Sequence, residues 1–207
     1  MRSFFLAIFV FVVGLQLDAQ NVQLHYDLGD DRQMPTGTFE MFRPDSVGST
    51  FFFVDFDFGG KAADVSGVSL AYLELSRDLR FWKPLVAIHV EYNGGMLRTS
   101  EFASDINNAA LLGAGYTWNN ADFSRILSFQ VLYKYIERVY DASFQITGVW
   151  EMHFFNRKVS FTGFADFWRE KTTVFDSDGV PSTERFIFIS EPQLWYNFNK
   201  NFSLGGE

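Results

Sequence analysis

Carboxylate side chains recur inside aromatic segments of this chain, and they are the residues best suited to chemistry. Residues 50–58 read T-F-F-F-V-D-F-D-F, so Asp55 and Asp57 interrupt a run of phenylalanines. An unpaired carboxylate is costly to bury in an apolar core, whereas a cluster of exposed rings is unfavourable in water. The segment therefore requires a fold with an apolar environment on one face and water on the other.

The same mixture of polar groups and rings returns in three later segments. Their polar-face residues are His89, Glu91, Asn93, Asp166, Trp168, Glu191 and Gln193. Carboxylates attract cations and accept hydrogen bonds from hydroxyl groups, while aromatic rings stack on flat solutes. A water-filled face of this kind predicts binding of small polar solutes and exclusion of anions. The alternative is that these carboxylates pair with the few basic side chains and only solvate a wide pore.

Metal binding and catalysis are weakly indicated. The three histidines, His25, His89 and His153, fall on the polar face but in three separate segments, so no close-spaced ligand pair exists. The serines on the same face are Ser128, Ser143 and Ser160. No nucleophile motif surrounds these serines, which leaves a membrane-embedded enzyme as a minor alternative. We expect no catalytic residue, no metal site and no cofactor.

Composition narrows the class of protein further. The chain has 207 residues, 26 of them Phe, and a formal net charge of −8. A nucleic-acid-binding protein needs clustered Lys and Arg, so a nucleic-acid partner is not expected. There is no cysteine, which excludes a disulfide framework.

Apolar and polar residues alternate with a period of two from Asn21 onward, which is the pattern of β-strands. In residues 52–58, Phe52, Val54, Phe56 and Phe58 form one face, while the aspartates fall on the other. The other regular segments are 22–28, 38–41, 86–93, 128–135, 143–154, 159–170 and 185–198. Segments 67–78 and 108–118 alternate less regularly, and a last strand begins at Phe202. The chain therefore predicts about ten strands plus that final start.

Strand length favours a membrane barrel over a soluble sandwich. Several segments reach roughly 10–15 residues, while soluble strands average about 5–6 and membrane-spanning strands need about 9–11. We therefore expect an all-β, up-and-down antiparallel transmembrane β-barrel. An open edge is not viable in lipid, and single-chain bacterial barrels have an even strand number. We accordingly expect 12 strands when complete, with the last one missing from this chain.

Connections between the predicted strands differ in length, and outer-membrane barrels have long external loops and short periplasmic turns. The predicted external connections are Gly29–Pro35, Gly59–Ser66, Gly94–Asn107, Glu137–Asp141 and Thr172–Thr183. The predicted periplasmic ones are Pro44–Gly48, Leu79–Lys83, Asn119–Asp122, Asn156–Arg157 and Asn199–Lys200. Four of the five external connections are longer than every periplasmic one.

The first 19 residues have the layout of a secretory signal peptide. Arg2 precedes an uncharged apolar run from Phe4 to Leu15, and a small residue, Ala19, offers a cleavage position. The expected organisation is a signal peptide over 1–19 and a C-terminally incomplete outer-membrane barrel over 20–207.

Four motifs add a family resemblance: S-T-F-F-F-V-D-F-D-F, H-V-E-Y-N-G-G, F-A-D-F-W-R-E and S-E-P-Q-L-W-Y-N-F-N. They resemble the Tsx-like nucleoside-specific outer-membrane channels, in particular the shorter branch of Bacteroides-type bacteria. The resemblance covers residues 20–207 and implies a narrow, monomeric, twelve-stranded barrel that admits nucleosides and deoxynucleosides. It also implies substrate contacts at the matching interior positions. These are Phe51, Phe53, Asp55, Asp57, His89, Glu91, Asn93, Asp166, Trp168, Glu191 and Gln193.

Together, residues and resemblance predict a passive channel for nucleosides in the bacterial outer membrane, in contact with outer-membrane lipid and lipopolysaccharide. The interior cations are expected to be few: Lys134 and, less firmly, Arg125 and Arg185. Two alternatives remain. One is a general small-solute porin, and the other is a non-conducting structural or adhesion barrel.

Overall fold

A computed structural model describes residues 20–30, 32–61, 63–82, 85–139, 143–175 and 181–206 of the chain. The predicted signal peptide, residues 1–19, lies outside these ranges. The described chain forms eleven strands. They are β1 Gln20–Tyr26, β2 Pro35–Asp45, β3 Gly48–Phe58, β4 Val68–Leu79, β5 Val86–Arg98, β6 Ala103–Asn119, β7 Arg125–Ile136, β8 Ser143–Phe154, β9 Val159–Phe175, β10 Pro181–Asn199 and β11 Phe202–Gly206. Within the described ranges, no helix is long and apolar enough to cross a membrane.

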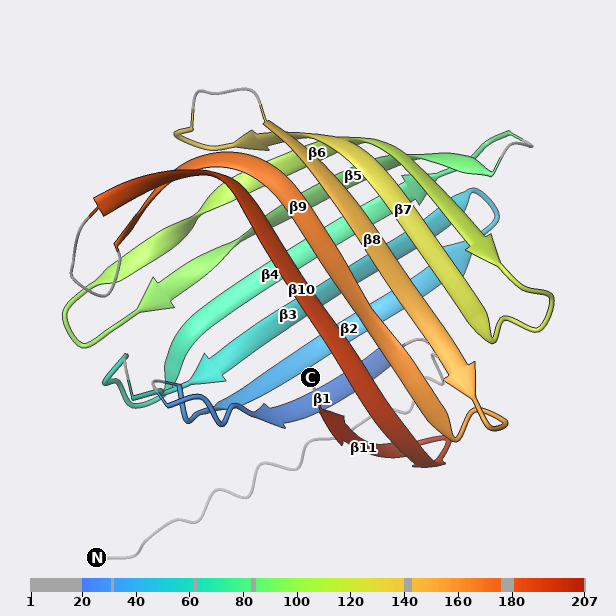
Figure 1. Cartoon of the computed structure of the whole chain (residues 1–207), viewed down its shortest axis with the longest axis horizontal. Helices are drawn as coiled ribbons and strands as arrows, with labels where there is room; N and C mark the ends of the chain where they lie inside the picture. Colours follow the sequence, from blue (N-terminus) through green and yellow to red (C-terminus); the bar gives the residue numbers. More distant parts are fainter. Residues whose placement is uncertain are drawn as a thin grey trace, which may run out of the picture.

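All eleven strands belong to one antiparallel sheet in which each strand pairs with its neighbours in the sequence. The sheet curls into a nearly closed barrel, as Figure 1 shows. The seam lies between β1 and β11, which do not pair with each other in the described chain. Inside the barrel, the ring of His25 in β1 lies 5.8 Å from that of Trp195 in β10. The predicted all-β, up-and-down antiparallel barrel is confirmed.

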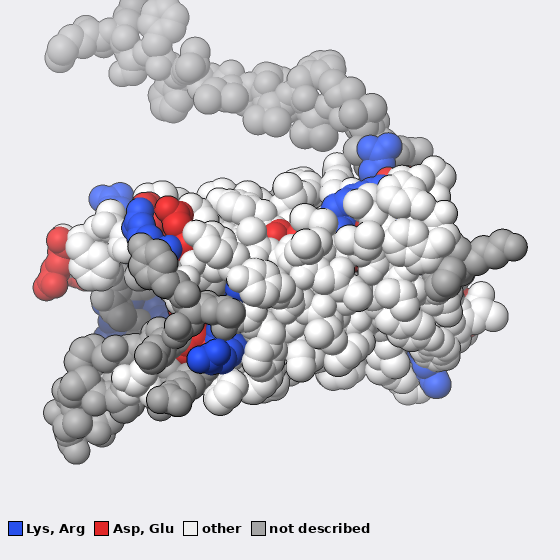
Figure 2. Space-filling view, turned by 90° about the horizontal axis from the view of Figure 1, so that it is seen from above, with Lys and Arg blue, Asp and Glu red and all other residues white. Residues whose placement is uncertain are grey.

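Side chains alternate between the interior of the barrel, here called the lumen, and its outer wall. Strand β7 shows the rule, because Leu132 and Lys134 are buried in the lumen, whereas Tyr133 and Tyr135 are more than half exposed on the outer wall. The two-residue period of a strand produces this separation without any special contact. In Figure 2, most charged side chains lie toward the two ends, with a largely uncharged wall between them. The outer wall is therefore apolar and the lumen polar.

A small apolar patch lies inside the barrel. It consists of Ala109 and Leu111 in β6 and Leu132 and Ile136 in β7. Leu111 and Leu132 are each only 1% exposed. These apolar side chains are shielded from water by the polar side chains that surround them. Charges next to the patch are therefore less screened than charges in open water.

Two of the predicted external loops are wrong in extent. The segment predicted as the connection Gly94–Asn107 is mostly strand, since β5 continues to Arg98 and β6 begins at Ala103. Gly94 and Gly95, where that connection was predicted to begin, lie at a β-bulge at which the pairing of β5 with β6 shifts register between Asn93 and Gly95. Likewise β9 continues to Phe175 and β10 begins at Pro181, inside the predicted Thr172–Thr183 connection. Part of the predicted difference in loop length is therefore a difference in strand length.

The connections at the other end of the barrel are tied to each other. The Nη2 of Arg157, between β8 and β9, donates to the backbone oxygens of Asp122 (3.0 Å) and Phe123 (3.2 Å), between β6 and β7. The Asp122 carboxylate in turn accepts hydrogen bonds from the Ser124 hydroxyl (2.9 Å) and backbone amide (3.2 Å). These bonds favour the ionised carboxylate and lower the pKa of Asp122 below its usual range.

Candidate functional site

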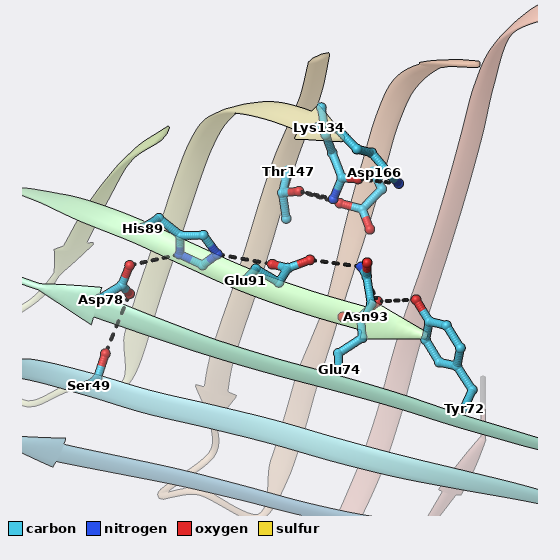
Figure 3. Close-up of polar contacts among 11 residues, drawn as sticks. Ser49, Tyr72, Glu74, Asp78, His89, Glu91, Asn93, Lys134, Thr147 and Asp166 are labelled. Carbon is cyan, nitrogen blue, oxygen red and sulfur yellow. Dashed lines mark hydrogen bonds and ion pairs between the residues drawn. The ribbon is translucent and has the colours of Figure 1, made fainter. Parts of the chain in front are cut away.

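All of the predicted site residues lie on the lumenal face of their strands. They come from β3, β5, β9 and β10, so they surround the lumen instead of forming one cluster. A partly buried polar cluster runs from β4 and β5 across the lumen to β7, β8 and β9, and Figure 3 shows it. We call it the ion cluster. Its residues are Tyr72, Glu74, Asp78, His89, Glu91, Asn93, Lys134, Gln145, Thr147 and Asp166.

His89 lies at the centre of one half of the ion cluster. Its Nδ1 is 2.8 Å from Asp78 Oδ1, and its Nε2 is 3.0 Å from Glu91 Oε2. The histidine is 2% exposed and Glu91 9% exposed. Only the doubly protonated imidazolium can donate to both carboxylates at once. The geometry therefore fits a cation held between two anions.

The hydrogen bonds continue along β5 and back to β4. Asn93 Nδ2 donates to Glu91 Oε1 (3.0 Å) and approaches Glu74 Oε1 (3.5 Å). The hydroxyl of Tyr72 donates to the same Glu74 oxygen at 2.7 Å. Alternate residues of two adjacent strands thus form one continuous chain of donors and acceptors.

Strands β7, β8 and β9 supply the facing half of the ion cluster. Lys134 Nζ donates to Gln145 Oε1 (2.8 Å), and Gln145 Nε2 donates to Thr147 Oγ1 (3.0 Å). The Thr147 hydroxyl donates to Asp166 Oδ1. The Lys134 ammonium also lies 4.2 Å from the centre of the Trp168 ring, in a cation–π contact.

The strand register places the two halves at the same level of the lumen. Glu91 of β5 pairs with Leu111 of β6, and Leu111 pairs with Lys134 of β7, so the two charged residues share one row across the sheet. His89 pairs with Gly113, and an added Cβ at Gly115 would lie 3.4 Å from Asp78 Oδ1. The small residues of β6 therefore leave room for the histidine and its partner carboxylate.

Aromatic rings line β3 and β4 beside the ion cluster. The ring centres of Phe51 and Phe53 are 6.1 Å apart, and Phe53 is 6.0 Å from Tyr72. Further along β3, Asp55 accepts a hydrogen bond from Thr38 (2.5 Å) and Asp57 from Thr36 (2.6 Å). Rings and carboxylates are thus presented together on one strand.

Another polar group lies next to the seam, on β10. Gln193 Nε2 donates to Glu191 Oε1 at 2.7 Å, and Trp195 Nε1 donates to Gln193 Oε1 at 3.0 Å. His25 of β1 reaches the edge of the Trp195 ring from the other side of the seam. This group is partly exposed, in contrast to the buried His89, Glu91 and Lys134 of the ion cluster.

Charge in the lumen is strongly unbalanced. The acidic side chains on lumenal positions include Glu40, Asp55, Asp57, Glu74, Asp78, Glu91, Glu151, Asp166, Glu170 and Glu191. Among the described strand side chains, Lys134 is the one Lys or Arg on a lumenal position. The expectation that Arg125 faces the lumen is wrong, because it shares the outward face of β7 with Leu127 and pairs with Met152. The side chain of Arg185 lies outside the described part.

Comparison with known proteins gives one result for the whole barrel. A family model described as "Domain of unknown function (DUF5020)" matches residues 19–207. The chain belongs to the DUF5020 family. No curated protein and no solved structure matched it.

Several residues of this DUF5020 site were missed at the sequence level. Asp78 was not expected beside His89, and Gln145, Thr147 and Trp195 were not expected as partners of other polar groups. Alternation assigns each of them to a face, but only the cross-strand register says which side chains become neighbours. In the described chain, no group of three or more His, Cys, Asp or Glu side chains is arranged to hold a metal ion.

Proposed function

We propose that this DUF5020 protein spans the bacterial outer membrane as a β-barrel. We further propose that it passes small polar solutes by passive diffusion, with nucleosides as the preferred class. The apolar outer wall supports the membrane location, because side chains such as Leu112, Phe129 and Tyr133 are each more than half exposed. An apolar wall of this extent is expected against lipid and unfavourable against water.

One observation carries the channel proposal: the lumen is acidic and contains aromatic rings at the same level. The carboxylates of Asp55, Glu74 and Glu91 repel anions and attract cations or neutral hydroxyl-bearing solutes. The rings of Phe51, Phe53 and Tyr72 offer flat faces to a base. This combination suits a nucleoside, whose base stacks and whose sugar hydroxyls donate to carboxylates. The resemblance to Tsx-like channels favours the same solute.

Liposome swelling tests the proposal. The protein, purified in detergent and reconstituted into liposomes, should admit a nucleoside faster than a hexose at equal osmotic strength. Equal swelling rates would reject nucleoside preference and leave a general small-solute porin. No swelling above protein-free liposomes would reject the channel itself.

Phe53 is the ring to change first, because it contacts both Phe51 and Tyr72. Phe53→Ala should reduce the swelling rate with a nucleoside at least about 5-fold, as one stacking contact is worth about 1–3 kcal/mol. Swelling with the hexose should stay the same or rise. The matched control is Phe52→Ala, which removes the neighbouring ring on the outer wall. Equal effects of the two variants on the nucleoside rate would contradict a role of Phe53 in solute contact.

The second candidate is a non-conducting barrel with a structural or adhesive role. The ion cluster favours it, since its buried side chains from β5, β7 and β8 occupy part of the lumen. Reconstituted protein that is folded, as judged by heat-modifiable gel migration, yet gives no ion conductance would support this second function.

A further inference from the structure

Lys134 is held in a fixed position inside the lumen. It is 8% exposed, donates to Gln145 and lies against the face of Trp168. Trp168 is itself held by a hydrogen bond of 2.8 Å from its Nε1 to Glu170 Oε2. Leu111, its cross-strand partner on β6, and Leu132, two residues earlier on β7, are almost fully buried. A flexible surface lysine has none of these restraints.

Four carboxylates act electrostatically on this one ammonium. Asp166 and Glu170 come from β9, on the same side of the ion cluster, while Glu74 and Glu91 come from the facing strands β4 and β5. His89, the other candidate cation of the cluster, is already enclosed by Asp78 and Glu91. Among the described lumenal side chains, Lys134 is therefore the one Lys or Arg that offsets the remaining negative charge in this part of the lumen.

From this geometry we propose that Lys134 is the specificity-determining residue for charge. Its ammonium partly neutralises the negative charge of Asp166, Glu170 and Glu91. The lumen therefore does not bind cations strongly, and neutral polar solutes can pass. The proposal rests on the channel function proposed above and adds the residue that sets its selectivity. A fixed charge beside a narrow passage acts with opposite sign on the cations and anions that pass it.

Lys134→Met tests the proposal without removing the aliphatic bulk of the side chain. The measured quantity is the K⁺/Cl⁻ permeability ratio, obtained from the reversal potential in a planar bilayer under a KCl gradient. The ratio should rise about fivefold. That is the change expected when one elementary charge about 8 Å from the ion path, acting through water, has opposite effects on the two ions. Lys134→Arg should keep the wild-type ratio.

Two further variants separate charge from fold. Lys158→Met removes the same charge from the exposed connection between β8 and β9, and should leave the ratio unchanged. The double variant Lys134→Met/Glu170→Gln removes one charge of each sign, and should return the ratio close to wild type. Heat-modifiable gel migration checks that each variant is folded. If Lys134→Met does not fold, Lys134→Gln takes its place with the same expected rise.

The outcomes distinguish this proposal from the channel function on which it rests. A conducting Lys134→Met or Lys134→Gln protein with a wild-type ratio would overturn the role of Lys134 and leave the channel function intact. A wild-type protein that gives no conductance would overturn the channel function, and the role of Lys134 with it. An equal rise in Lys158→Met would also overturn the proposal, because the effect would then come from net charge alone.

Discussion

His89 lies where the two-residue alternation of its strand places it, on the lumenal face of β5. Its face could be predicted from the sequence, and so could the faces of Asp55, Glu91 and Asp166. Its main partner, Asp78, could not be predicted, because the pairing of β4 with β5 depends on where the intervening turn begins. Alternation thus fixes which side of the wall a residue occupies, whereas register fixes its contacts.

Replacing His89 should destabilise the barrel strongly. His89→Leu keeps bulk but leaves the carboxylates of Asp78 and Glu91 without their shared donor, and loss of one partner from a buried pair costs about 3–5 kcal/mol. The free energy of unfolding can be measured with urea, following tryptophan fluorescence of the reconstituted protein.

The matched control for this prediction is His153→Leu. His153 also bonds a carboxylate, Glu151 (2.8 Å), but that carboxylate is 47% exposed, so the loss should be at most about 1 kcal/mol. An equal decrease in the free energy of unfolding for the two variants would show that the buried contacts of His89 stabilise the barrel no more than the exposed contact of His153.

At the scale of strands, the sequence predicts well where a β-strand occurs, but it does not predict at which residues the strand begins and ends. A connection was predicted to begin at Gly94, yet β5 continues through Gly94 and Gly95 by means of a bulge. An added Cβ at Gly95 would lie 2.3 Å from the backbone oxygen of Ala71. Glycine is therefore required here by the close approach of two strands, and a single sequence does not distinguish that requirement from the requirement of a turn.

Gly163 in β9 provides a second test of this kind. Its φ of +148° is rare for other residues, and an added Cβ would lie 2.2 Å from Glu191 O and 2.8 Å from the Trp150 ring. Gly163→Ala should lower the free energy of unfolding in urea by about 1–3 kcal/mol, because the backbone or the ring must shift.

Gly148→Ala in the adjacent strand β8 is the control for Gly163→Ala. Nothing lies within 4 Å of a Cβ added at Gly148, so this variant should unfold close to the wild-type urea concentration. If Gly148→Ala lowered the free energy of unfolding more than Gly163→Ala, close packing of backbone and ring atoms against Gly163 would be contradicted.

At the scale of the whole molecule, the separation of an apolar outer wall from a polar lumen follows from the sequence pattern alone. The strands are long, their alternation is regular, and each pairs with its neighbour in the sequence, so the up-and-down order is the simplest solution. How side chains fill the lumen could not be predicted in the same way. The ion cluster joins residues from β4, β5, β7, β8 and β9, and such contacts depend on barrel curvature as well as on pattern.

Conductance in a planar lipid bilayer tests the central claim most directly. The folded wild-type protein should insert and give discrete current steps. Under a KCl gradient the reversal potential should have the sign of a cation-preferring pore, since lumenal carboxylates outnumber lumenal cations in the described strands. Addition of a nucleoside should reduce the current as it occupies the lumen. Folded, heat-modifiable protein that inserts and gives no current steps would contradict a solute-conducting lumen.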